Sequence, residues 1–187
     1  MIAVIAGAAC LLIGGAFALW RAPVEFAENG RLSSFTFVAA FVAFAGPVLC
    51  TFVAAWNASW PLAIPDGVAL ACGSALILVG AAAHLTARIQ FRSFRLAWGL
   101  SSDRLVTTGI YRYSRNPQLV GWALILLGVA LFGRSGAALL LAAMFWASCL
   151  IYVPVEERFL ERRYGSAYKQ YKSSAPRYFG FPKGTES

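Results

Sequence analysis

A polar and basic block at residues 105–121 separates stretches of the chain that are apolar enough to enter a membrane. It holds two tyrosines, two arginines and an asparagine, which are Tyr111, Arg112, Tyr113, Arg115 and Asn116. Their side chains supply hydrogen-bond donors and acceptors, and the arginines carry a permanent charge. Any chemistry that the chain performs is expected to depend on this block.

Two adjacent carboxylates, Glu156 and Glu157, follow the last apolar stretch. A carboxylate at the edge of a membrane is costly unless it has a partner. Two interpretations are open. The pair forms ion pairs with Arg158, Arg162 or other basic residues, or one of the two binds a polar ligand at the membrane surface.

The residues after this pair predict an amphipathic tail helix. Leu160, Tyr164, Tyr168 and Tyr171 recur at helical spacing and share one face. We expect this helix to lie along the cytoplasmic surface of the membrane, with its aromatic face towards lipid and its charges in water.

The composition predicts the elements that must position these groups. Of 187 residues, 59% are hydrophobic and 13% are charged, which indicates an integral membrane protein. Residues 2–20, 35–56, 68–87 and 137–155 have about the 20-residue length that a bilayer requires. The apolar stretch at residues 119–132 is shorter than that length, so this helix either begins earlier, near Asn116, or fails to span the membrane completely.

The predicted fold class is all-α: a polytopic membrane bundle of about five transmembrane helices. A tight break at residues 133–136 makes a helical hairpin of the last two, and the amphipathic tail follows. Residues 1–187 are expected to form one membrane domain. Three helices fall in residues 1–87, and the polar connection, hairpin and tail fall in residues 88–187.

The basic residues predict the orientation. Fifteen of the sixteen Lys and Arg residues fall in three segments, residues 21–32, 88–118 and 158–183, and only Arg134 falls elsewhere. A five-helix path with its N-terminus outside puts all three segments on one face, which the positive-inside rule makes cytoplasmic. Membrane lipid therefore accounts for the net charge of +8, and a nucleic-acid partner is not indicated.

We expect the cysteines, the single histidine and several glycines to have structural roles. The four cysteines lie in apolar segments without paired spacing or a nearby histidine, so we expect buried thiols and no metal site. His84, the single histidine, either bridges to a neighbouring helix, which we favour, or acts on an acceptor proton. Gly73, Gly80, Gly121 and Gly128 indicate close helix contact.

Two linked blocks carry a resemblance to a known family. Residues 105–121 read LVTTGIYRYSRNPQLVG, and the tail reads EExxLxxxYGxxYxxY from Glu156. In this order and spacing they resemble the isoprenylcysteine carboxyl methyltransferase and phospholipid methyltransferase superfamily. The resemblance covers about residues 88–180.

The resemblance implies an integral membrane enzyme of lipid metabolism that uses S-adenosylmethionine, bound from the cytosolic side. It implies a lipophilic or amphiphilic acceptor, either a phospholipid amine or an isoprenylcysteine-like carboxylate. Carried over by position, it assigns catalytic roles to Arg115, Asn116 and Glu157. The cofactor-binding residues it implies are Leu105, Val106, Tyr111, Tyr113, Arg115, Asn116, Gly121, Glu156 and Glu157.

This chain departs from the family pattern at three positions. Asn116 stands where many members have His, Leu119 where the block usually has Tyr, and Asp103 near a place where a His often precedes the Leu-Val pair. Asparagine forms hydrogen bonds but does not titrate near neutrality, so Asn116 is expected to position the cofactor and not to act as a base. Gln118 is expected to supply part of the polarity lost at Leu119.

Three functions are open. The first is the methyltransferase, and the second is an NADPH-dependent reductase resembling the sterol reductases, although Trp122 follows Gly121 where their pattern has Glu. The third is a non-enzymatic lipid-binding membrane protein. Since Arg115 and Glu157 are expected at a polar mouth, Glu157→Gln and Arg115→Ala should weaken cofactor binding without unfolding the protein. The residue usage suggests a bacterial source and therefore an inner-membrane location.

Overall fold

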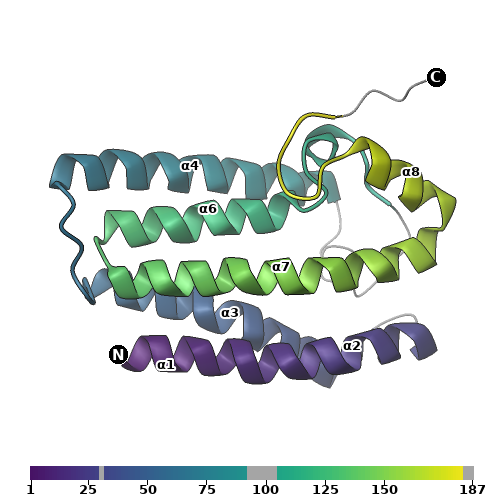
Figure 1. Cartoon of the computed structure of the whole chain (residues 1–187), viewed down its shortest axis with the longest axis horizontal. Coiled ribbons are helices and arrows are strands. Elements are labelled where there is room, and N and C mark those ends of the chain that lie inside the picture. The colour runs from purple at the N-terminus through teal and green to yellow at the C-terminus, as the bar shows by residue number, and fades with distance from the viewer. Residues whose placement is uncertain (30–31, 92–104, 183–187) are drawn as a thin grey trace.

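The computed structural model describes residues 1–29, 32–91 and 105–182, and within these ranges the fold is all-helical. Long helices run side by side and form an elongated bundle (Figure 1). The elements in chain order are α1 (Ile2–Ala9), η1 (Cys10–Gly14), α2 (Gly15–Asn29), α3 (Ser34–Trp56), α4 (Asp66–Phe91), η2 (Gly109–Arg112), α6 (Pro117–Phe132), α7 (Gly136–Tyr164) and α8 (Ser166–Ser174).

Four helices are long and apolar enough to cross a membrane. They are Ile2–Glu25, Ser34–Trp56, Asp66–Gln90 and Gly136–Tyr164, and the first of them continues through the π-helical turn η1. Large side chains cover the outer faces of these helices; Leu78, Leu85 and Ile89 of α4 are each more than half exposed. Such surfaces are stable in lipid and not in water, which confirms the predicted all-α membrane bundle.

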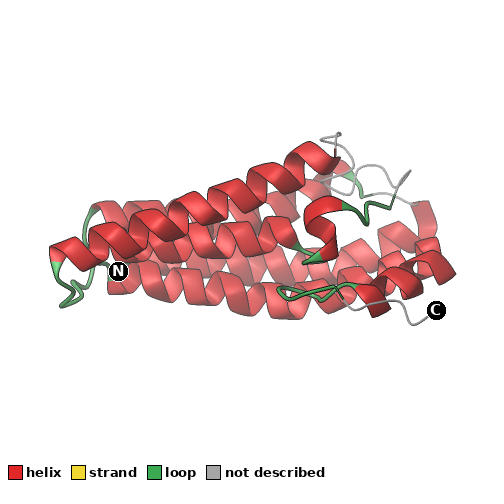
Figure 2. Cartoon of the chain, turned by 90° about the horizontal axis from the view of Figure 1, so that it is seen from above, coloured by secondary structure: helices red, strands yellow, loops and turns green. Residues whose placement is uncertain are grey.

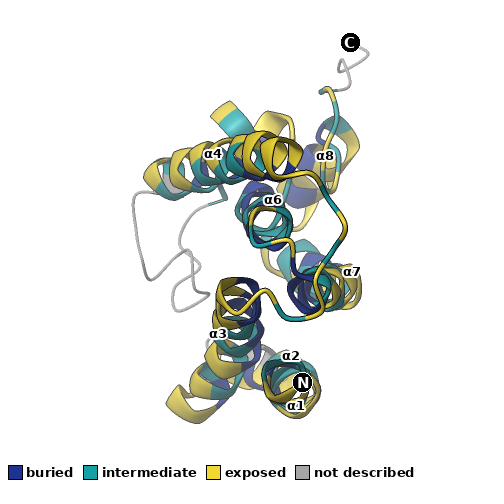
Figure 3. Cartoon of the chain, turned by 90° about the vertical axis from the view of Figure 1, so that its left-hand side faces the viewer, coloured by how far each residue is buried: buried dark blue, intermediate teal, exposed yellow. Residues whose placement is uncertain are grey.

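The short helix begins where the sequence suggested. α6 starts at Pro117 with Asn116 as its N-cap residue, and proline suits the first turn because its missing N–H has no helical partner there. Its 16 residues cover about 24 Å at ~1.5 Å each, against a hydrocarbon core of ~30 Å. Viewed along the bundle, α6 lies among α3, α4 and α7 (Figure 3), and Phe132 at its end is exposed.

Close contact between α4 and α6 depends on glycine, as predicted. A Cβ at Gly80 would lie 2.6 Å from the Gly121 carbonyl oxygen, and a Cβ at Gly73 would lie 2.8 Å from the Phe132 nitrogen. No side chain fits at these distances, so the two backbones touch directly. This contact fixes the start of α6, and with it the polar block, against α4.

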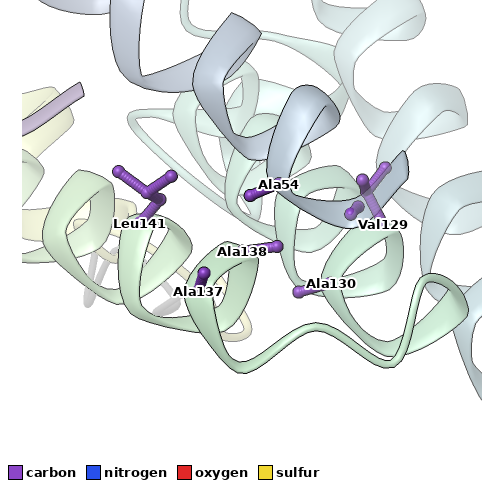
Figure 4. Packing of buried hydrophobic residues seen from close by; sticks show 7 residues of the cluster. Ala54, Val129, Ala130, Ala137, Ala138 and Leu141 are labelled. Atoms are coloured by element: carbon purple, nitrogen blue, oxygen red, sulfur yellow. The ribbon is translucent and has the colours of Figure 1, made fainter. Parts of the chain in front are cut away.

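The break between α6 and α7 forms the predicted hairpin. Ser135 caps α7 by accepting a hydrogen bond from the Ala138 nitrogen at 3.1 Å, and its Oγ donates to the carbonyl oxygens of Ala54 and Ser59. A buried apolar cluster packs α3, α6 and α7 together near the hairpin (Figure 4). This cluster includes Ala54, Val129, Ala130, Ala137, Ala138 and Leu141.

The predicted tail helix is interrupted. α7 continues past the two glutamates to Tyr164, and Gly165 then turns the chain into α8 with φ of 55° and ψ of −126°. Only glycine adopts this conformation without strain. The tail is thus two helical segments at an angle, and not one continuous helix.

The described parts of the three basic segments meet at one end of the bundle. α2, α4 and α7 end there, while α3 and α6 begin there (Figures 1 and 2). The opposite end holds the exposed ion pair between Arg134 and Asp66. Arg31, Arg92, Arg95, Asp103, Arg104 and Lys183 lie outside the described residues.

Candidate functional site

The centre of the candidate site is a buried ion pair between Arg115 and Glu157. Both Nε and Nη2 of Arg115 donate to Glu157 Oε1, at 3.0 and 2.6 Å. The Arg115 side chain is 8% exposed and that of Glu157 is 4% exposed. The structure thus joins the polar block to the last apolar helix, through two residues 42 positions apart.

A second arginine completes the pairing of Glu157. Arg177 donates from Nε and Nη2 to Glu157 Oε2, at 3.1 and 2.8 Å. Its side chain remains 41% exposed, and the hydrogen bond to Glu157 raises the pKa of its guanidinium. Sequence reasoning counted Arg177 only as one of many basic tail residues, because no spacing pattern relates it to Glu157.

The tail is tied across this cluster by backbone contacts. Arg115 Nη1 donates to the carbonyl oxygens of Lys172 and Ala175, at 2.9 and 2.6 Å, and the Arg115 nitrogen donates to the Pro176 oxygen. The Asn116 amide Nδ2 donates to the Arg177 oxygen at 3.0 Å. We call residues 105–116 and 165–182 the cap, since they fold together over the helix ends.

The burial of this pair corrects one expectation. Arg115 and Glu157 were expected at an open polar mouth, where replacement would leave the fold intact. They are instead buried where the cap meets α7, and removal of Arg115 leaves the buried Glu157 carboxylate with the partly exposed Arg177 alone. Breaking a buried ion pair by removing one partner is strongly destabilising. Arg115→Ala is therefore expected to affect folding as well as binding.

An aromatic cluster forms the buried side of the cap and packs against the end of α7. Tyr111, Tyr168 and Tyr171 are each less than 10% exposed and pack with Val106, while Leu160 and Tyr164 pack against them. Tyr171 donates its hydroxyl to the Tyr111 carbonyl at 2.8 Å. The residues predicted to share one face of a single helix come from two helices, α7 and α8, but they do pack in one cluster. The prediction that Tyr168 and Tyr171 face lipid is wrong, because both are buried. The residues of the polar block cover them.

Glu156 differs from its neighbour. It is half-buried, and within the described ranges it has no hydrogen bond or ion pair. Burial raises the pKa of the Tyr111 hydroxyl, and the nearby Glu156 carboxylate raises it further, while a hydrogen bond from Gln118 opposes both. A carboxylate at a membrane boundary is costly without a partner, so Glu156 is a candidate for binding a ligand.

The remaining predicted residues are spread around this centre. Leu105 packs against the aromatic cluster, whereas the Tyr113 side chain is 46% exposed and its carbonyl accepts from the Gly180 nitrogen. Gln118 donates to the Tyr111 hydroxyl at 3.1 Å. Asp103 lies outside the described residues.

Two of the singled-out residues lie at the contact between α4 and α6. Gly121 is buried against the backbone of Gly80 and His84. The His84 ring packs edge-on to Trp122, with 5.3 Å between ring centroids. Its Nδ1 is buried without a hydrogen bond to any described residue.

Comparison with known proteins now gives the family. A family model described as phospholipid methyltransferase matches residues 68–167, which include Arg115 and both glutamates. A relative from the fission yeast Schizosaccharomyces pombe, named protein-S-isoprenylcysteine O-methyltransferase, is 36% identical over 73 residues.

That alignment covers 38% of this chain and 31% of the yeast protein, so it spans about a third of the relative's length. No solved structure matches the chain. The family model covers more than half of the 187 residues and includes α4, the polar block, the hairpin and the glutamate pair. The chain belongs to the phospholipid methyltransferase family.

Proposed function

We propose that this protein is an S-adenosylmethionine-dependent methyltransferase that acts on a lipid-embedded or amphiphilic acceptor. The observation that carries the proposal is the buried ion pair of Arg115 with Glu157, next to Glu156 in the chain, at the end of an apolar bundle and inside the family match. Burying charged side chains at the edge of a membrane costs free energy, and such charges are often found at functional sites.

The charged side chains at the site complement the charged groups of S-adenosylmethionine. S-adenosylmethionine carries an ammonium and a sulfonium, both cationic, and a carboxylate. Glu156 has no partner among the described residues, and one of the two arginines on Glu157 is partly exposed to solvent. In the proposal, Glu156 binds a cationic group of the cofactor. Glu157, Arg115 and Asn116 position its polar end, with Glu157 acting through the arginines that it holds.

The chemistry makes few demands on acid–base catalysis. The bound cofactor supplies an electrophilic methyl group on a positively charged sulfur, which is already a good leaving group. The protein's task is to align an acceptor with that methyl group and to exclude water, and such alignment can supply much of the rate acceleration. Asn116, which cannot titrate near neutrality, is compatible with this role.

The position of the cluster gives access to a polar cofactor on one side and to an apolar acceptor on the other. The cap is polar and exposed on its outer side, so a water-soluble cofactor reaches it from the aqueous phase. The helix faces below it are apolar, so a greasy acceptor reaches it from lipid. We assign this end to the cytoplasm, with the N-terminus outside, because the described basic residues other than Arg134 gather there.

A reductase is the second candidate, and the family match favours the methyltransferase over it. A non-enzymatic lipid-binding role does not account for the buried charges. The test is calorimetric titration of the detergent-purified, folded protein with S-adenosylhomocysteine and, separately, NADPH. Micromolar binding of the first alone supports the proposal, and NADPH binding alone contradicts it.

A positive titration is followed by transfer of labelled methyl groups from S-adenosylmethionine into a lipid extract. Labelled lipid supports an enzyme with a lipid acceptor. Binding of neither ligand to folded protein would leave the non-enzymatic role.

A further inference from the structure

The turn between α7 and α8 forms a basic groove on the surface of the protein. Gly165 makes the bend in its glycine-specific conformation, and α8 leads away from the axis of α7 (Figure 1). The bend leaves a groove of about 510 Å³. Six residues line it: Arg158, Glu161, Arg162, Gly165, Ser166 and Lys169.

This groove holds more positive charge than its own carboxylate neutralises. Both oxygens of Glu161 are engaged, one with Lys172 Nζ at 3.2 Å and the other with Lys169 Nζ at 4.0 Å. Arg158 and Arg162 are four positions apart on α7 and therefore share one face. Neither has a hydrogen bond or an ion pair to any residue that the structure describes. Two exposed guanidinium groups are available to an anion.

The length of α7 places the groove among lipid headgroups. Its 29 residues extend about 43 Å at ~1.5 Å each, whereas the hydrocarbon core is ~30 Å thick. With the hairpin near the opposite boundary, the last turns of α7 extend beyond the hydrocarbon. The anion that is abundant at that level is the phosphate of a phospholipid.

We propose that this groove binds the phosphate of an anionic phospholipid, and that Arg158 and Arg162 are its main ligands. Guanidinium groups form paired, charge-assisted hydrogen bonds with phosphate oxygens. The first amides of α8 lie at the same bend without a side-chain cap, and they add donors of the right polarity. The groove shares no residue with the Arg115–Glu157–Arg177 cluster, so the lipid bound here is not the proposed methyl acceptor.

Arg163 offers a matched control for the test. It is exposed, carries the same charge and adjoins Arg162 on α7, but it does not line the groove. The full-length protein in neutral detergent is titrated with short-chain phosphatidylglycerol, with short-chain phosphatidylcholine and with inorganic phosphate, and the thermal unfolding midpoint is followed. The samples are wild type, Arg158→Gln, Arg162→Gln and Arg163→Gln.

We expect phosphatidylglycerol to raise the midpoint of wild type and Arg163→Gln, and to bind Arg158→Gln and Arg162→Gln about tenfold more weakly. Equal weakening of Arg162→Gln and Arg163→Gln would show diffuse electrostatic attraction and overturn the proposal. An equal response to phosphatidylcholine, which has the same phosphate but no net charge, would overturn the proposal by showing no preference for an anionic lipid. An equal response to inorganic phosphate alone would overturn it by showing a simple anion site. Failure of S-adenosylhomocysteine binding would not affect this result, since the two sites are separate.

Discussion

The two ends of the α6–α7 pair both use polar side chains to hold a helix end, but they do so differently. At the hairpin end, Ser135 satisfies three backbone groups, and the single ion pair, Arg134 with Asp66, is exposed. At the cap end, Arg115, Glu157 and Arg177 form a network whose central carboxylate is 4% exposed. The hairpin needs only neutral hydrogen bonds to be closed, so stability alone does not require buried charge.

This difference separates structural polarity from functional polarity. A buried ion pair often contributes no more stability than well-packed apolar side chains would, because each charge loses its hydration. Such a pair is therefore weak evidence for stability and better evidence for a ligand site. If this interpretation is correct, changes at the hairpin end should alter folding alone, and changes at the cap end should alter folding and cofactor binding.

The largest effect is expected for Arg115→Ala. It leaves Glu157 with one partner and removes two hydrogen bonds that hold the tail, so we expect a loss of about 3–5 kcal/mol in the free energy of unfolding. Unfolding in mixed detergent micelles, together with proteolysis of the tail, measures it. A variant as stable as wild type would show that the buried pair is not formed in the membrane.

An intermediate effect is expected for Ser135→Ala at the hairpin end. The change removes the cap of α7 and the hydroxyl that lies within hydrogen-bond distance of the Ala54 and Ser59 carbonyl oxygens, although both oxygens keep a backbone N–H donor. We expect a cost of about 1–2 kcal/mol. Binding of S-adenosylhomocysteine should stay within twofold of wild type at a temperature where both proteins are folded. Loss of binding would remove the distinction between the two ends.

A smaller effect is expected for Arg177→Gln. Arg177 is partly exposed, so solvent screens its interaction, and Glu157 keeps its buried partner; a loss of about 1 kcal/mol is expected. The same unfolding assay checks it. A loss equal to that of Arg115→Ala would show that the two arginines are equivalent, contrary to their different burial.

The smallest effect is expected for Arg134→Gln. Its ion pair with Asp66 is exposed on both sides, and such pairs contribute about 0–1 kcal/mol. The free energy of unfolding should fall by no more than this amount, and the affinity for S-adenosylhomocysteine should not change. A loss above 2 kcal/mol would mean that exposure does not explain the difference between the ends.

Much of the fold followed from local sequence patterns. The shortness of the apolar stretch at 119–132 indicated an earlier start of α6, near Asn116, and the Gly-Arg-Ser-Gly break at 133–136 placed the hairpin, because such signals act within a few residues. The glycines predicted the contact of α4 with α6, because only a missing side chain permits that distance. These features depend on neighbours along the chain or on residue size, both of which a sequence displays.

The rest depended on contacts between distant segments. Helical spacing placed Tyr164, Tyr168 and Tyr171 on one face, but it did not reveal that the polar block would cover that face instead of lipid. The bend at Gly165 was visible only as one more glycine, and Arg177 as one more basic residue. The meeting of Arg115 with Glu157 was implied by the family resemblance, and no periodic pattern in the chain predicts it.

The most direct test of the central claim compares two variants at opposite ends of the bundle. S-adenosylhomocysteine is titrated calorimetrically into wild type, Glu157→Gln and Ser135→Ala, each shown to be folded at the temperature of the experiment. The account predicts wild-type affinity for Ser135→Ala and an affinity at least about tenfold weaker for Glu157→Gln, which keeps the shape of the side chain but loses its charge. Wild-type affinity of Glu157→Gln, or equal loss in both variants, would contradict it.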